Sequence, residues 1–223
     1  MPNPPPPCAV NAPDGLALLY ADEWLVAVDK PAGMLSVPGR GADKADCAAR
    51  RVQAVFPDAL IVHRLDMGTS GVLVFGRGAA AQRALSISFA ERAVAKRYLA
   101  VVAGSPTTDD GRIDLPLICD WPNRPRQMVD AERGKPSTTL WRLLARHDGP
   151  PRTARLALTP VTGRSHQLRV HLQALGHPIV GDELYAPPEV HALAPRLLLH
   201  AESLTLPHPA DGRALTLTSP CPF

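Results

Sequence analysis

The chain has 223 residues, 45% of them hydrophobic and 20% charged, so it is long enough to bury a core in one large or two small domains. Its four cysteines lie far apart without the paired spacing of a zinc site, and no apolar run reaches membrane-spanning length, which together indicate a reduced cytoplasmic protein without metal. The formal net charge of +3 leans basic but does not by itself identify a nucleic-acid-binding protein.

The first residues of the chain differ in composition from the rest. The stretch "PNPPPP" lacks the charged start and the apolar core of a signal peptide. Runs of proline favour an extended polyproline conformation over a packed fold. We therefore expect residues 1–15 to form a disordered arm and residues 16–223 to form the folded domain.

The first half of the chain predicts strands and helices in turn. Residues 16–20 and 25–29 have the composition of a β-hairpin that turns through Ala21-Asp22. Apolar residues at helical spacing then predict a short helix that Pro57 stops. Two strands are expected at 60–65 and 71–76, followed by a helix over about 79–92.

Strands dominate the second half. The segments "KRYLAVVAG", "TTLWRLLAR" and "ARLALTP" are typical of strands, as are "RLLLHAESLTL" and "ALTLT" near the end. The segment "SHQLRVHLQALG" predicts a helix with Ser165 as its N-cap, Leu168, Leu172 and Leu175 on one face, and Gly176 at its end. Adjacent strands with few crossover helices predict an α+β fold on a largely antiparallel sheet.

Several common catalytic motifs are missing from the sequence. It has no phosphate-binding glycine loop followed by Lys-Ser/Thr, and no G-x-S-x-G elbow. His63, Asp66 and Ser70 supply the residue types of a hydrolytic triad, but closeness in sequence does not create triad geometry. His166 and His171 are five residues apart, which on a helix places them on different faces and argues against a metal pair.

Asp66 is the remaining catalytic candidate, and it lies on a segment that passes from a strand into a turn. Aspartate beside Gly-Thr-Ser commonly caps a turn, and that ordinary role is one interpretation. The other is chemical, because an arginine paired with a buried aspartate keeps the carboxylate charged and oriented, as a nucleophile or general base requires. The residues alone leave both open.

The segment "HRLDMGTSG" resembles the signature H-R-L-D-x-x-T-S-G of the RluA-type RNA pseudouridine synthases. The resemblance continues in "KRYLAVV", "TGRSHQLRVHL", "GHPIVGD" and "RLLLHA", and so covers nearly the whole chain from about residue 16. It implies the α+β pseudouridine synthase fold, a largely antiparallel mixed sheet in two subdomains flanking a catalytic cleft. It also implies a single catalytic domain at 16–223 without an appended S4-type RNA-binding domain.

The resemblance assigns catalytic roles to three residues. Asp66 matches the essential aspartate of the family, Tyr98 the tyrosine placed against the target base, and Arg169 the arginine that forms an ion pair with the aspartate. Converting uridine to pseudouridine breaks the bond from C1′ to N1, turns the base and joins C1′ to C5. A carboxylate could act as nucleophile or as base toward the sugar, and the sequence does not choose between them. No cofactor is required.

Further residues are expected to bind the RNA. Arg64 would fill the space that the target uridine leaves when it flips out of its stack, since a guanidinium can stack and donate hydrogen bonds at once. Leu199 would provide an apolar wall of the cleft. The remaining substrate-binding candidates are signature residues and basic loop residues: His63, Thr69, Arg124, Arg126 and Arg164.

Within the family, the resemblance is strongest to members that act on two RNAs. It implies uridine 746 of 23S ribosomal RNA and uridine 32 of tRNA anticodon stem-loops as targets, for a monomeric enzyme. Alternatives are a synthase with one different target, and a binding-only homologue, although this chain keeps Asp66, Tyr98 and Arg169. A glycoside-cleaving hydrolase would need a second carboxylate, for which Asp182 or Glu183 could be nominated.

Overall fold

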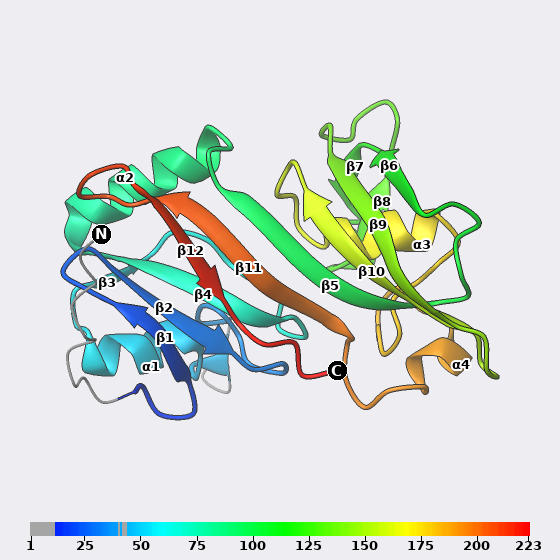
Figure 1. The fold of residues 1–223 in the computed structure, drawn as a ribbon, viewed down its shortest axis with the longest axis horizontal. Helices are drawn as coiled ribbons and strands as arrows, with labels where there is room; N and C mark the ends of the chain where they lie inside the picture. The colour runs from blue at the N-terminus through cyan, green and yellow to red at the C-terminus, as the bar shows by residue number, and fades with distance from the viewer. Residues whose placement is uncertain (1–11, 40, 42–43) are drawn as a thin grey trace. The chain divides into compact units, whose positions relative to one another are not determined.

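The computed structural model describes residues 12–39, 41 and 44–223, and the chain divides into two compact units (Figure 1). The first unit runs to Ala95 and resumes over Ser203–Pro220. The second comprises Lys96–Glu202 together with Cys221–Phe223. Of the arm expected at residues 1–15, residues 1–11 lie outside the described part of the chain.

Strands of the first unit pair antiparallel with their neighbours. β2 lies between β1 and β4, β3 also pairs with β4, and β12 pairs with β11. These strands are β1 (Ala17–Ala21), β2 (Leu25–Lys30), β3 (Ala59–Ile61), β4 (Ser70–Arg77), β12 (Ala214–Thr218) and the part of β11 (Leu199–Pro207) from residue 203 onward.

Two helices complete the first unit, α1 (Ala48–Val55) and α2 (Gly78–Ala90). α1 ends where Pro57 follows, as expected, because a residue before proline avoids the helical conformation. One apolar cluster takes alternate residues of β2, β4 and β11, which lie on one face of these strands, and Leu85 adds the α2 side. Its buried members are Leu25, Ala27, Val72, Val74, Leu85, Val94, Leu204, Leu206 and Leu217.

In the second unit the strands run in the order β5-β10-β9-β6, and β7 and β8 form a separate two-stranded sheet. All these pairings are antiparallel. The strands are β5 (Ala95–Ala103), β6 (Asp110–Asp114), β7 (Leu117–Cys119), β8 (Gln127–Val129), β9 (Thr138–His147) and β10 (Thr153–Pro160).

One face of these four strands carries the core of the unit. Ala154, Leu156 and Leu158 alternate along β10, and α3 (Gln167–Ala174) contributes Leu168 and Leu172 to the same cluster. A one-turn helix, α4 (Pro188–His191), follows. Each unit thus has a buried apolar cluster of its own.

The predicted α+β architecture with antiparallel pairing is confirmed, and three details are wrong. The strand expected at 60–65 ends at Ile61, because the residues after it hydrogen-bond outside the strand ladder. Ser165 is not the N-cap of α3; His166 is, in a left-handed conformation with φ 51°. Leu175 is exposed, because α3 ends before it. β6, the β7–β8 hairpin and α4 were not predicted.

Within the described residues, no helix combines the length and the apolar character needed to cross a membrane. Over the same residues, no three His, Cys, Asp or Glu side chains are grouped so that they could hold a metal ion. Cys47, Cys119 and Cys221 are free thiols.

Candidate active site

The signature segment forms a tight turn in the first unit, just before β4. The backbone N–H of Thr69 donates to the carbonyl oxygen of Asp66 at 3.1 Å, which closes a turn through Met67 and Gly68. Thr69 is buried, whereas Asp66 is half-buried at the start of the turn. Gly71 has φ +115°, a conformation that glycine adopts readily and that residues with a side chain avoid.

A buried serine fixes the residue before Asp66. The Ser36 hydroxyl donates to the carbonyl oxygen of Leu65 at 2.7 Å and accepts the N–H of Leu65 at 3.0 Å. Both polar groups of one backbone residue are thereby satisfied by a single side chain. Ser36 lies 29 residues away in sequence, so this contact ties the signature to the segment after β2.

A fully buried lysine fixes the residue after Asp66. The Lys30 ammonium group, at the end of β2, donates to the carbonyl oxygens of Met67 at 3.2 Å, Pro31 at 2.9 Å and Met34 at 2.7 Å. The N–H of Gly33 also donates to Met67 O at 2.8 Å. The backbone on both sides of Asp66 is therefore held by buried hydrogen bonds, which is how a reactive side chain is preorganised.

Neither Lys30 nor Ser36 was among the residues predicted to matter. Lysine is ordinarily exposed, so a lysine at the end of a strand gives no sign of burial. The signal available in the sequence is its position, at the end of the strand "LVAVDK" and next to Pro31.

His63 and Arg64 are neighbours in sequence but differ in their surroundings. The His63 ring stacks on Phe89 of α2, with centroids 4.7 Å apart, and its Nε2 accepts the N–H of Val74 at 3.0 Å. His63 thus anchors the signature to β4 and α2. Arg64 is exposed, as a side chain entering RNA must be. Substrate binding by either residue stays a prediction.

Tyr98 and Leu199 belong to the second unit. Tyr98 lies in β5 opposite Leu158 of β10, half-buried against the core of this unit. Leu199 begins β11 and is buried in the same core, in keeping with an apolar wall. The contact of either side chain with a target base stays a prediction.

Arg169 of α3 forms a bidentate ion pair with Asp182. Its Nε donates to Oδ2 at 2.8 Å and its Nη2 to Oδ1 at 2.7 Å, and the two side chains are 6% and 0% exposed. Asp182 Oδ1 also accepts the backbone N–H groups of Leu184 and Tyr185. The pairing of Arg169 with Asp66 stays a prediction. Asp182, with both oxygens bonded to Arg169, is a poor second carboxylate for a hydrolase.

Tyr185 contacts several segments of the second unit that carry predicted site residues, and sequence reasoning missed it. Its hydroxyl accepts the N–H of Gln127 at 2.8 Å and lies 2.7 Å from Nδ1 of His166. Its ring lies 5.0 Å from the guanidinium carbon of Arg169 and 5.7 Å from that of Arg126. The only signal was an aromatic residue soon after "GHPIVGD".

The histidine within α3 has a structural role. His171 is fully buried, with Nδ1 at 2.9 Å from Thr139 Oγ1 and Nε2 at 3.1 Å from both Ser137 Oγ and the carbonyl oxygen of Leu115. Burial lowers the pKa of His171, which favours the neutral ring. These contacts hold α3 against β9.

The three candidate arginines of the loops are all exposed side chains of the second unit. Arg124 Nε donates to the carbonyl oxygen of Trp121 at 3.1 Å, and Arg126 Nη2 donates to that of Leu184. Arg164 Nε donates to Pro136 O at 3.4 Å. In each of these contacts the acceptor is a backbone carbonyl oxygen and not a carboxylate, so the positive charge is suited to a phosphate group.

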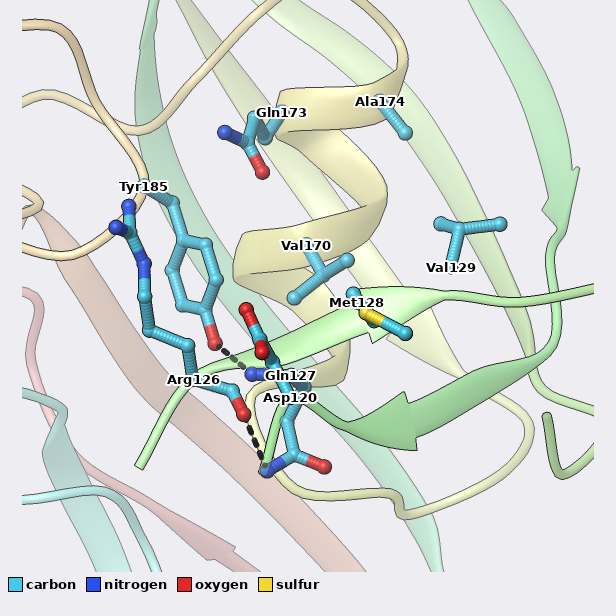
Figure 2. A pocket seen from close by; sticks show the side chains of 9 residues that line it. All are labelled: Asp120, Arg126, Gln127, Met128, Val129, Val170, Gln173, Ala174 and Tyr185. Atoms are coloured by element: carbon cyan, nitrogen blue, oxygen red, sulfur yellow. Dashed lines mark hydrogen bonds between the residues drawn. The ribbon is translucent and has the colours of Figure 1, made fainter. Parts of the chain in front are cut away.

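A pocket of about 240 Å³ lies between the β7–β8 hairpin and α3 (Figure 2). Apolar side chains of β8 and α3 line one part, and polar groups line the other. The lining residues are Asp120, Arg126, Gln127, Met128, Val129, Val170, Gln173, Ala174 and Tyr185.

Comparisons with known proteins identify the family of this chain. Residues 24–174 match the family model described as RNA pseudouridylate synthase. The dual-specificity RNA pseudouridine synthase RluA of Escherichia coli K12 is 52% identical over 208 residues, covering 93% of this chain and 94% of the relative. RluA of Pasteurella multocida is 49% identical over the same shares.

Solved structures show the same fold. Human RNA pseudouridylate synthase domain containing 1 is 29% identical, with a TM-score of 0.79 over 96% of this chain and 86% of that one. The chain belongs to the RNA pseudouridylate synthase family. It is an RNA pseudouridine synthase, an isomerase that acts on uridine in RNA.

Proposed function

We propose that this enzyme isomerises uridines in two structured RNAs, uridine 746 of 23S ribosomal RNA and uridine 32 of tRNA anticodon stem-loops. One observation carries the proposal. Relatives named as dual-specificity synthases are 52% identical over 93% of the chain and are covered almost from end to end. A cytoplasmic location and a monomeric state belong to the same proposal.

In this proposal Asp66 acts on the sugar of the flipped uridine, as nucleophile or as base, while the C1′–N1 bond opens. The base turns, C1′ joins C5, C5 loses its proton and N1 gains one. The proton lost from C5 is balanced by the one gained at N1 and nothing is oxidised, so the step needs no cofactor. The fixed backbone at Leu65 and Met67 supports this role, because it limits where the carboxylate can lie.

Two residues of the second unit would complete the reaction. Tyr98 would stack on the uracil, and its hydroxyl would take the C5 proton. Arg169, which already forms a buried ion pair with Asp182, would also form an ion pair with Asp66.

Other residues would bind the RNA. Arg64 would enter the RNA stack that the uridine leaves, with His63 and Thr69 shaping the turn beside it. Arg124, Arg126 and Arg164 would contact phosphates, and Leu199 would wall the base site.

The test is single-turnover pseudouridine formation on synthetic stem-loops. One stem-loop carries the anticodon loop with uridine 32, one the ribosomal loop with uridine 746, and a third has a scrambled loop on the same stem. We expect modification of the first two and none of the third, because a compact RNA-binding domain recognises folded shape and a few exposed bases. Equal rates on all three, or modification of one target alone, would contradict the dual specificity.

Asp66→Asn serves as the chemical control. It should bind both stem-loops with nearly unchanged affinity, because one carboxylate contributes little to an interface made mostly of phosphate contacts, but it should form no pseudouridine. Turnover within about tenfold of the wild type would remove Asp66 from the mechanism, since losing an essential nucleophile or base costs far more. Free uracil among the products would indicate a hydrolase instead.

A further inference from the structure

Trp121 is unusually exposed for a tryptophan. It lies in the loop between β7 and β8 and is 65% exposed, against 37% for Trp24 and 6% for the core residue Trp141. Tryptophan is normally largely buried, so an exposed indole on a loop is a feature that needs a reason. None of the assigned functions uses Trp121.

The loop holds Trp121 in place with its own hydrogen bonds. Asp120 N donates to Arg126 O at 3.0 Å, Asn123 N to Asp120 O at 3.1 Å, and Arg126 N to Asn123 O at 3.0 Å. The Asn123 side chain also donates to the Asp120 carboxylate at 2.9 Å. The indole is therefore presented by a closed loop, and the only carboxylate among residues 120–126 is already bonded within it.

Arg124 lies on the Trp121 ring. Its guanidinium carbon is 4.4 Å from the ring centroid, and its Nε donates to the backbone carbonyl of Trp121 at 3.1 Å. This cation–π contact leaves a stacked pair of planar groups at the surface, one apolar and one positively charged. Such a pair matches a nucleotide, whose base offers a π-face and whose phosphate carries the opposite charge.

The base of the loop is fixed to the segment of Leu184 and Tyr185, which contacts Arg169. Gln127 N donates to the Tyr185 hydroxyl at 2.8 Å, and Arg126 Nη2 donates to Leu184 O. Tyr185 in turn lies against Arg169. A ligand bound at Trp121 would thus have a defined position relative to α3 within the same unit.

We propose that Trp121, with Arg124 behind its ring, is a stacking platform for one unpaired base of the RNA substrate, separate from the target uridine. The inference rests on the proposed RNA function and adds to it a contact that distinguishes RNAs by which loop base is unstacked. The occupant is a nucleobase because the loop is net positive, with Arg124 and Arg126 against Asp120, and so complements a phosphate backbone.

The experiment combines variants with abasic RNAs. Binding of an anticodon stem-loop is measured for the wild type, Trp121→Ala and Trp121→Phe, with Trp24→Ala as the matched control in the other unit. Trp121→Ala should weaken binding about tenfold, the usual scale for loss of one base–aromatic stack, and Trp121→Phe clearly less. The dependence of log affinity on log salt should keep its slope, because no phosphate contact is removed.

Each unpaired loop nucleotide other than the target is then made abasic in turn. At one position, the abasic RNA should bind the wild type about tenfold more weakly but Trp121→Ala nearly as well as the intact RNA does. Additive losses at every position would overturn the platform, as would wild-type affinity of Trp121→Ala for the intact RNA.

The same samples are assayed for pseudouridine, which separates the two proposals. Modification by the wild type without coupling at Trp121 would leave the proposed function standing and remove the platform. Coupling without any modification of these stem-loops would do the reverse.

Discussion

The buried pair of Arg169 and Asp182 shows how one residue depends on another inside this fold. A guanidinium that is only 6% exposed has lost most of its water, and the fully buried Asp182 carboxylate replaces that water with two hydrogen bonds. Removing Asp182 takes both of these hydrogen bonds from a buried guanidinium, and the loss of a buried charge partner costs far more than the pair contributes when intact.

Asp182→Ala should therefore lower the free energy of unfolding by about 3–5 kcal/mol, the typical cost of breaking a buried ion pair. The control is Asp109→Ala, which breaks the surface pair with Arg146, where the side chains are 79% and 40% exposed. That change should cost at most about 1 kcal/mol. Urea unfolding of both variants measures the difference, and equal costs would contradict the structural role of Asp182.

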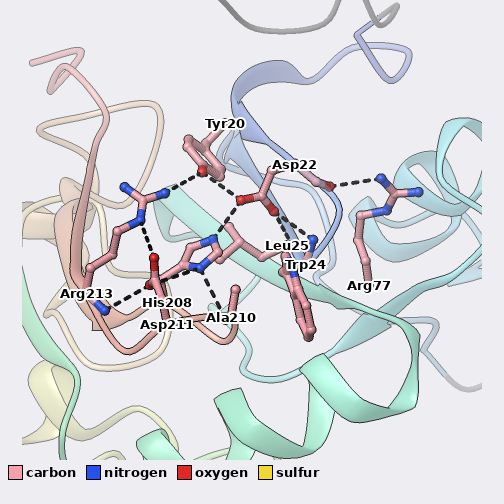
Figure 3. Close-up of polar contacts among 9 residues, drawn as sticks. All are labelled: Tyr20, Asp22, Trp24, Leu25, Arg77, His208, Ala210, Asp211 and Arg213. Atoms are coloured by element: carbon pink, nitrogen blue, oxygen red, sulfur yellow. Dashed lines mark hydrogen bonds and ion pairs between the residues drawn. The ribbon is translucent and has the colours of Figure 1, made fainter. Parts of the chain in front are cut away.

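At the scale of elements, a polar network joins the β1–β2 turn to the turn between β11 and β12 (Figure 3). Asp22 Oδ1 accepts the backbone N–H groups of Trp24 and Leu25, at 2.8 and 2.9 Å. Asp22 Oδ2 accepts the Tyr20 hydroxyl and lies 2.7 Å from Nε2 of the buried His208. One carboxylate thus closes its own hairpin and fastens a second one.

This network shifts the pKa values of Asp22 and Tyr20. Burial alone would raise the pKa of Asp22, but the hydrogen bonds from Leu25, Trp24, Tyr20 and His208 together lower it below its usual value of 3.8. Burial and the nearby Asp22 carboxylate raise the pKa of Tyr20. The charged form of Asp22 is therefore the form that stabilises the fold.

The pH dependence follows from the sign of that shift. A lowered folded-state pKa contributes stability above the unfolded pKa, and the contribution is lost as pH falls through the folded pKa. Asp22→Asn should therefore lower Tm clearly near pH 7 and much less near pH 2.5. Asp14→Asn, at a side chain that is 98% exposed, is the control and should shift Tm little at either pH. A loss of equal size for Asp22→Asn at both pH values would contradict the prediction.

At the scale of the whole molecule, the net charge is small, and many of the positive side chains are already paired. The formal net charge is only +3, and many arginines are already paired with carboxylates, as Arg112 is with Asp114 and Arg152 with Asp148. Attraction to RNA must therefore come from particular arginines rather than from the average field.

Arg124→Ala combined with Arg126→Ala should weaken stem-loop binding and reduce the slope of log affinity against log salt, by about 0.7–0.9 for each lost phosphate contact. The matched control combines Arg112→Ala with Arg152→Ala, which removes the same charge from arginines of the same unit. That control should keep most of the slope. Equal changes in the two double variants would show that net charge alone governs binding.

The sequence by itself determined most of the elements and the family. The β1–β2 hairpin, α1, α2 and the alternation of Ala154, Leu156 and Leu158 were predicted, because local periodicity and turn residues encode them. The signature around Asp66 was enough to indicate the chemistry. β6 and the β7–β8 hairpin were missed because these strands are short and have little apolar alternation of their own.

The tertiary structure decided which polar side chains are buried and what they hold. Lys30 reaches Met67 across 37 residues, and Ser36 reaches Leu65 across 29. The N-cap of α3 is His166 and not Ser165. His166 Nδ1 contacts the hydroxyl of Tyr185, which is 19 residues away in sequence. Local sequence specifies backbone conformation through neighbours a few residues apart. A buried hydrogen bond between distant segments forms only when both are folded, so no local pattern reveals it.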